Sequence, residues 1–317
     1  MFTRTFKKGP FEFKRINNDS PLYVRILSEK IGAIKFLPDF SEDKGVFILT
    51  DFGGEHKEAS FSTYSFLICS ADKRYVFEDA MISIRKKHNL ISPWKELAYK
   101  DLRYGPIKMA LDDILDAANN LIHGLLFTIS IDRRIDTLFG PDKKSAHAQI
   151  VDLLKENNLG IWKGNEAEKL LRVCYPVGIL LSILTRSEQK ILWICDNDSI
   201  NQNGKSRNFS HTQKLTSQIV AMLSDNQYEI FGFARPFKND TGTSDLLSIT
   251  DFSSGVIQEI LHTEFFDSDL QVSEEKAKIG RWMGSKSHFL AKHNIAIMKG
   301  DYDNLEIRTI ELQEKPP

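Results

Sequence analysis

The sequence has few cysteines, no long hydrophobic run and no excess of either charge. Its three cysteines, Cys69, Cys174 and Cys195, lie far apart and form no CxxC pair. This sparse count argues against a disulfide framework and a zinc site, and it fits a reducing compartment. The longest apolar stretch, residues 177–184, is far shorter than the roughly 20 residues that span a bilayer. No membrane role is therefore expected.

Charge is balanced, with 42 basic and 43 acidic residues and a net charge of −1. A near-neutral chain has no global attraction for nucleic acid, although a local basic groove remains compatible with it. The N-terminus lacks the 7–15-residue apolar segment of a secretory signal. We therefore expect a cytoplasmic protein.

Alternating helix and strand patterns run along the chain. Apolar, β-branched runs predict strands at 45–54, 59–70, 125–131, 191–198 and 228–234. Helical spacing predicts helices at 73–88 (capped by Asp72), from Pro106 to about 121, and at 146–154, 167–184, 213–223 and 245–261. Residues 22–27 read as a strand and 96–102 as a short strand or loop. A hairpin at 295–312 is expected to pair with N-terminal strands. The order predicts an α/β fold with a mixed sheet covered by helices.

Aspartates stand where several apolar runs end. Asp51 closes FILTD, Asp196 and Asp198 close ILWICDND, and Asp251 lies within LLSITDFSSGV. Carboxylates at strand ends point to the sheet edge where open α/β folds place their sites, and several together repel unless a cation intervenes. Oxygen ligands of this kind suit Mg²⁺ or Mn²⁺, and a pair of such ions stabilises both oxygens of a phosphoester cleavage. The alternative for each aspartate is a turn residue or a helix N-cap.

In the order of these residues the chain resembles a bacterial family of uncharacterised proteins with a ribonuclease H-like fold. The family's opening strand ends in Asp-Glu-Ser-Gly, and the stretch from Asp51 to Gly54 keeps the first Asp and the last Gly. Its next acidic and basic positions match Glu96 or Asp101 and Lys100. Its fourth strand ends in an acid, here Asp196 or Asp198. Its closing Leu-Gln-Leu-Ala-Asp helix resembles residues 247–257, with Asp251 as the final acid.

The resemblance implies a ribonuclease H-like mixed sheet flanked by helices, with added N- and C-terminal strands. The core would span 45–262 with a helical insertion at about 140–188, between an N-terminal extension (1–44) and a C-terminal extension (263–317). It also implies a Mg²⁺- or Mn²⁺-dependent nuclease or phosphodiesterase, acting in phage or mobile-element defence. The implied catalytic residues are Asp51, Asp101, Asp196, Asp251 and Lys100, with metal held by Asp51, Asp196 or Asp198, and Asp251.

Two basic segments are candidate nucleic-acid contacts. Lys205, Arg207 and His211 surround Phe209 in a polar loop, a mixture that can guide a nucleic-acid strand or simply form a solvated loop. Residues 2–15 interleave phenylalanines with lysines and arginines. This segment is either a nucleic-acid arm or, as we favour, a strand with one buried face.

Two functions from different classes follow from these patterns. The first is a metal-dependent nuclease whose partner is DNA or RNA. The second is a non-catalytic module that keeps the fold and binds nucleic acid or protein. A homo-oligomer or a partner protein remains open in both.

Overall fold

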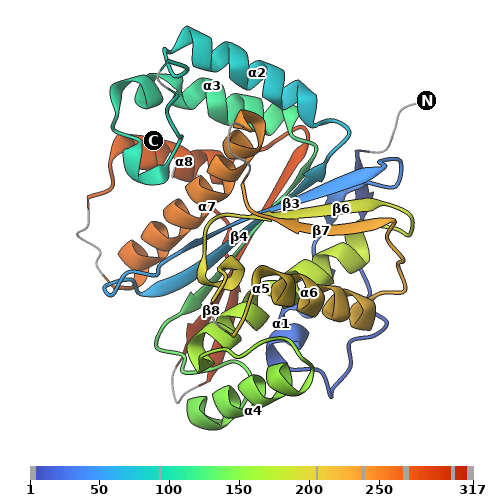
Figure 1. Ribbon diagram of the computed structural model, residues 1–317. Helices are drawn as coiled ribbons and strands as arrows, with labels where there is room; N and C mark the ends of the chain where they lie inside the picture. Colours follow the sequence, from blue (N-terminus) through green and yellow to red (C-terminus); the bar gives the residue numbers. More distant parts are fainter. Residues whose placement is uncertain are drawn as a thin grey trace. The chain divides into compact units, whose positions relative to one another are not determined.

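The computed structural model describes residues 5–92, 94–204, 206–236, 240–266, 271–300 and 304–312. As predicted from the sequence, the chain is an α/β protein with a mixed β-sheet flanked by helices. It also has a small two-strand sheet. It divides into two compact units. Unit 1 comprises Met1–Val46 and Ile135–Arg235, and unit 2 comprises Phe47–Arg134 and Pro236–Pro317. Each is described by itself below, and Figure 1 labels their elements.

Unit 1 contains two strand pairs and four helices in its described residues. Its elements are β1 Phe6–Lys8, α1 Leu22–Gly32, β2 Phe36–Pro38, α4 Lys143–Glu156, α5 Gly164–Leu184, β6 Lys190–Cys195, η2 Ser199–Asn201, α6 Phe209–Leu223 and β7 Ile230–Ala234. β1 pairs with β2 antiparallel, and β6 pairs with β7 in parallel. The long apolar helix α5 packs against α1, α4 and α6. The apolar stretch within α5 is therefore core.

Unit 2 contains the larger group of strands. Its elements are most of β3 Gly45–Gly53, then β4 Phe61–Ser70, α2 Arg74–Lys87, η1 Tyr99–Asp101, α3 Gly105–Leu121, β5 Gly124–Asp132, α7 Thr241–Phe265, α8 Glu274–Gly284, β8 Leu290–Lys299 and β9 Leu305–Thr309. The strands lie in the order β3-β4-β5-β8-β9. β4 pairs antiparallel with β5, β5 pairs parallel with β8, and β8 pairs antiparallel with β9.

Helix α7 is the element that positions the candidate site. Asp240 caps its first turn by accepting a 3.1 Å hydrogen bond from the N–H of Thr243. Figure 1 shows α7 lying over the strands, and it packs against β4 and β5. Small hydroxyl residues allow that close approach, because Ser253 Oγ lies 2.6 Å from Thr128 Oγ1 of β5. α7 is thus held by its cap and by a polar contact in the core.

Two predictions for the chain ends were wrong. Residues 22–27 belong to helix α1, because Tyr23, Leu27 and Ile31 bury one helical face. The predicted C-terminal hairpin is confirmed as β8 and β9, but it extends from β5 and does not pair with the N-terminal strands. β5 offers β8 a fully buried, nine-residue partner, whereas β1 has three residues.

Three smaller features add to the sequence predictions. The residue capping α2 is Lys73, without a side-chain cap hydrogen bond, rather than Asp72. Residues 96–102, expected to be a short strand or loop, form a loop with one 3₁₀ turn at 99–101. Helix α8 was not anticipated. In the sequence its charged residues obscure a narrow apolar face of Ile279, Trp282 and Met283.

The basic N-terminal segment is tied down within unit 1. Lys7 donates to the carbonyl of Ile183, and Arg15 donates to Ala221 O at 2.9 Å and pairs with Asp225. Only Phe6–Lys8 is a strand and none of residues 5–15 is buried, so the expected strand with one buried face is not confirmed; residues 1–4 lie outside the described residues. The three cysteines are free and buried, as small hydrophobic residues usually are. Across the described ranges, no helix is long and apolar enough to cross a membrane.

Candidate functional site

Two of the predicted metal-binding aspartates, Asp51 and Asp251, lie in unit 2 on elements that a hydrogen bond joins. Ser254, one turn after Asp251 on α7, donates a 2.7 Å hydrogen bond to Oδ2 of Asp51 on β3. The same hydroxyl lies 3.2 Å from the backbone carbonyl of Asp251. The backbone of β3 also lies close to α7 here, because a Cβ added at Gly53 would make ordinary contact with Ser254 at 3.5 Å. Strand β3 and helix α7 therefore bring Asp51 close to the turn that carries Asp251.

A backbone donor orients the second carboxylate. The N–H of Tyr99, the first residue of η1, donates a 2.7 Å hydrogen bond to Oδ2 of Asp251. Asp51 and Asp251 are both half-buried. Each therefore has one oxygen oriented by a protein donor, which is the arrangement that holds ligating carboxylates in metal sites.

The predicted residues Lys100 and Asp101 directly follow Tyr99 in η1. Lys100 is exposed, and Asp101 accepts a 2.8 Å hydrogen bond from Lys95 Nζ. That hydrogen bond lowers the pKa of Asp101 below its usual value and raises the pKa of Lys95. Asp101 is therefore an ion-pair partner of Lys95 in this structure. Glu96, the alternative acid, is exposed.

Sequence reasoning missed a second group of contacts on α7. The hydroxyl of Tyr99 donates to Glu259 Oε2 at 2.7 Å, and Lys276 Nζ of α8 donates to the same oxygen at 2.7 Å. Burial, with help from the Glu259 hydrogen bond, raises the pKa of Tyr99 far above its usual value. The phenol therefore stays a donor at neutral pH. The readable signal was the four-residue spacing of Asp251, Gly255 and Glu259, which places them on one helical stripe.

The remaining predicted acids belong to unit 1. Asp198 caps η2 by accepting from the N–H of Ile200 at 3.0 Å, Asn201 completes the capping box, and Lys169 pairs with the carboxylate. Asp196 is half-buried, and its Oδ1 accepts from the N–H of Asn197 at 2.7 Å. Asp198 thus has the N-cap role that was weighed as the alternative.

The predicted nucleic-acid loop is also in unit 1. Arg207 pairs with Glu166 and lies 4.5 Å above the ring of Trp162. His211 completes the capping box of α6 with Asn208. Lys205 lies outside the described residues. Arg207 and His211 therefore both have roles in holding the loop and the start of α6.

Mg²⁺ binds through one or two carboxylates plus water and substrate phosphates, and Asp51 and Asp251 supply that number. Within the ranges the structure describes, no group of three or more His, Cys, Asp or Glu residues is arranged to hold a metal ion. The candidate site in unit 2 therefore consists of two carboxylates, Asp51 and Asp251, and is called the Asp51–Asp251 centre.

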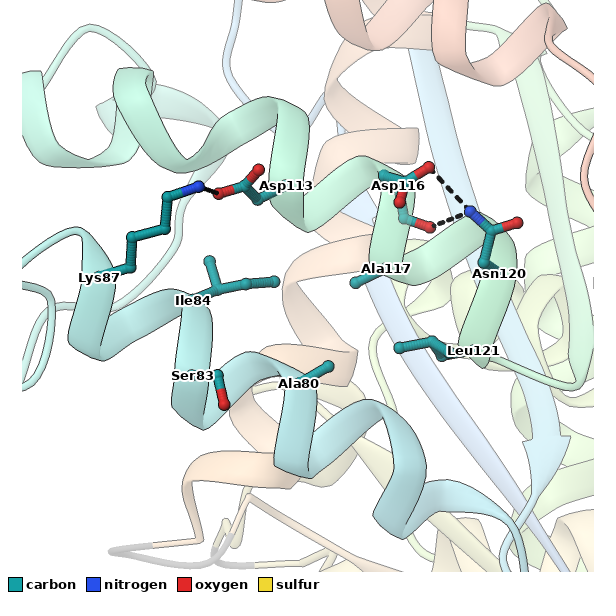
Figure 2. Close-up of a pocket in the computed structure, with 9 residues that line it drawn as sticks. All are labelled: Ala80, Ser83, Ile84, Lys87, Asp113, Asp116, Ala117, Asn120 and Leu121. Atoms are coloured by element: carbon teal, nitrogen blue, oxygen red, sulfur yellow. Dashed lines mark hydrogen bonds and ion pairs between the residues drawn. The ribbon is translucent and has the colours of Figure 1, made fainter.

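A shallow pocket of about 370 Å³ lies between α2 and α3 of unit 2 (Figure 2). Its rim groups pair with each other: Lys87 Nζ lies 2.7 Å from Asp113 Oδ2, and Asn120 Nδ2 lies 2.8 Å from Asp116 Oδ1. None of the residues predicted for catalysis, metal or nucleic acid lines this pocket. It is separate from the Asp51–Asp251 centre.

Comparison with known proteins gives no relative. No protein-family model, no curated protein and no solved structure matches the chain.

Proposed function

We propose that the chain is a Mg²⁺- or Mn²⁺-dependent nuclease or phosphodiesterase acting on DNA or RNA. The observation that carries the proposal is that Ser254, in the helical turn that begins at Asp251, donates to the carboxylate of Asp51. Carboxylates held near each other repel, and a bound cation would relieve that repulsion. The carboxylates come from a strand and a helix about 200 residues apart in sequence, so the fold itself maintains their proximity.

A ribonuclease H-like scaffold is the finer fold that we propose. It is supported by β3, β4 and β5 lying side by side in chain order in unit 2, and by the parallel β6–β7 pair in unit 1. The short connection between β3 and β4, residues 54–60, suits an antiparallel hairpin, whereas a parallel pair would require a long crossover. Phage or mobile-element defence is the setting that the family resemblance implies.

Each residue of the site has a part in the proposed reaction. Asp51 and Asp251 would hold the cation, which supplies charge stabilisation at a phosphoryl oxygen. Ser254 and the Tyr99 N–H fix one oxygen of each carboxylate. Lys100, exposed on η1, provides a positive charge for a backbone phosphate of the substrate.

Metal titration tests this proposal directly. We expect Mn²⁺ to bind the full chain saturably in calorimetry, and Asp51→Asn and Asp251→Asn each to abolish or strongly weaken that binding. Cleavage of single- and double-stranded DNA and RNA in the presence of Mn²⁺ should fall in the same variants. Asp152→Asn, at an exposed aspartate of α4 that has no part in the proposal, is the matched control. Undiminished cleavage in both the Asp51 and the Asp251 variant would remove the assignment.

A non-catalytic binding module is the second candidate. It is favoured because the described parts of the chain contain no group of three residues arranged to ligate a metal ion. Nucleic-acid binding that needs no divalent cation, together with unaltered binding in Asp51→Asn, would support the module over the enzyme.

A further inference from the structure

Tyr99 lies along one stripe of helix α7. Its backbone N–H donates to Asp251, and its hydroxyl donates to Glu259, eight residues further along the helix. Gly255 is midway between them. Residues four apart share a helix face, so Asp251, Gly255 and Glu259 form a continuous track. Tyr99 is in contact with all three.

Gly255 leaves the space that the aromatic ring of Tyr99 occupies, and this space is called the seat of the ring. A Cβ at this position would overlap the Tyr99 ring, at the atoms Cγ, Cδ1 and Cε1. Its backbone does not require glycine for a left-handed conformation, since it lies inside a regular helix. Glycine in a helix interior costs about 1 kcal/mol relative to alanine, so its value here is space.

The far end of the ring is anchored to a third element. Glu259 accepts from Tyr99 and from Lys276 of α8, and the Lys276 ammonium lies 5.2 Å from the centre of the Tyr99 ring. A cation at that distance from an aromatic ring is attracted to it. The hydroxyl end of Tyr99 is therefore fixed by an ion pair between α7 and α8.

We infer that Tyr99 is a positioning residue for the Asp51–Asp251 centre: seated at Gly255 and tethered at Glu259, it fixes the N–H that orients Asp251. The same contacts hold η1 in place, and Lys100 is the residue directly after Tyr99 in that turn. This inference rests on the proposed metal site, and it adds a residue that touches neither cation nor substrate. The sequence signature of the seat is Asp-x₃-Gly-x₃-Glu at 251–259.

Two measurements on the full chain test the inference. The first is calorimetric titration with Mn²⁺ for the wild type, Gly255→Ala, Tyr99→Phe and Tyr99→Ala. The second is hydrogen exchange of the Tyr99 amide, which needs no metal. Gly280→Ala is the matched control, because its Cβ would meet Ile260 of α7 at an ordinary 3.4 Å.

We expect Gly255→Ala to weaken Mn²⁺ binding about 10- to 100-fold, as loss of an outer-shell partner does, and to speed exchange of the Tyr99 amide. Tyr99→Ala should behave similarly. Tyr99→Phe keeps the ring seated and should lose less affinity than Gly255→Ala. Gly280→Ala should change neither measurement. Thermal melting of each variant separates these effects from loss of the fold.

The outcomes distinguish this inference from the proposed function. If the wild type binds Mn²⁺ and Gly255→Ala and Tyr99→Ala bind it equally well, the positioning role is wrong and the metal site stands. If the wild type binds no Mn²⁺, the metal site is wrong and the positioning role is overturned with it. Unchanged exchange of the Tyr99 amide in Gly255→Ala would contradict the seating itself.

Discussion

Arg85 of α2 and Asp245 of α7 form an ion pair almost fully withdrawn from water, with side chains 2% and 3% exposed. Arg85 Nε lies 3.0 and 3.1 Å from the two carboxylate oxygens. Another nitrogen of the guanidinium donates to the carbonyl of Lys95 at 2.8 Å. Arg85 thus links the backbone of Lys95 to helix α7, the helix whose Asp251 also accepts from Tyr99.

Removing one partner of this pair should be severe. We expect Arg85→Met to lower the free energy of unfolding by about 3–5 kcal/mol, because it leaves Asp245 buried and unpaired. The double variant Arg85→Met/Asp245→Leu should recover much of the loss. Urea denaturation measures both. The exposed pair of Arg281 and Glu274 is the control, and Arg281→Met should cost under about 1 kcal/mol. Equal losses at the two arginines would contradict the role of burial.

Ser254 should matter for metal more than for stability. We expect Ser254→Ala to reduce Mn²⁺ affinity about 10- to 100-fold, because the hydroxyl orients Asp51. The matched control is Ser248→Ala on the same helix, whose hydroxyl donates to the carbonyl of Ser244 at 2.9 Å. Calorimetric titration compares the two. Indistinguishable affinities would exclude Ser254 from the site.

Lys292 should make stability depend on pH. Burial lowers its pKa from 10.5 to about 7, and its contacts at Asn119 and Ser285 are uncharged. Between these two pH values the unfolded chain binds more protons than the folded chain, so the free energy of unfolding should rise from pH 7 to about 10.5. Lys292→Met should flatten this part of the profile. Urea denaturation at several pH values measures the slope, and an unaltered slope in the variant would refute the prediction.

The turn after β3 should require glycine. Gly54 has a φ of +76°, and an added Cβ would overlap the carbonyl oxygen of Phe61. We expect Gly54→Ala to lower the melting temperature strongly, since it combines strain with a backbone clash. Gly105→Ala is the control, because its Cβ would meet nothing within 4 Å. That variant should be neutral or slightly stabilising in the same melting experiment.

The sequence was sufficient to predict those helices and strands that have a single strong apolar pattern. Nearly continuous apolar runs predicted β3, β4, β5 and β6, and helical spacing predicted α2 to α7 to within a few residues at most ends. The failure at α1 has a clear cause. Its opening run, LYVRIL, is short and partly β-branched, and such a run suits either a strand or a buried helix face. The helix is favoured because it also buries Ile31, which lies beyond that run.

The candidate site was only partly readable. Asp51 and Asp251 were singled out because they stand beside apolar runs, and their role in a site stays a prediction. Asp198 proved to be an N-cap of the kind its Asn201 partner indicates. Tyr99 was not found, because its role depends on contacts with a helix some 150 residues away. No local pattern marks a residue of that kind. Gly255 and Glu259 had a readable spacing, but nothing in the sequence shows what occupies the stripe.

Neither unit is a continuous stretch of chain, and this has a consequence for synthesis on the ribosome. All of unit 1 has been made by Arg235, whereas β4 and β5 of unit 2 are made before α7, the helix that packs on them. The face of β4 and β5 that α7 later covers therefore lacks this helix while about a hundred further residues are synthesised. Asp51 cannot meet its partners on α7 until Ser254 has left the exit tunnel. A nascent chain would thus have no assembled carboxylate pair, however well its first unit had folded.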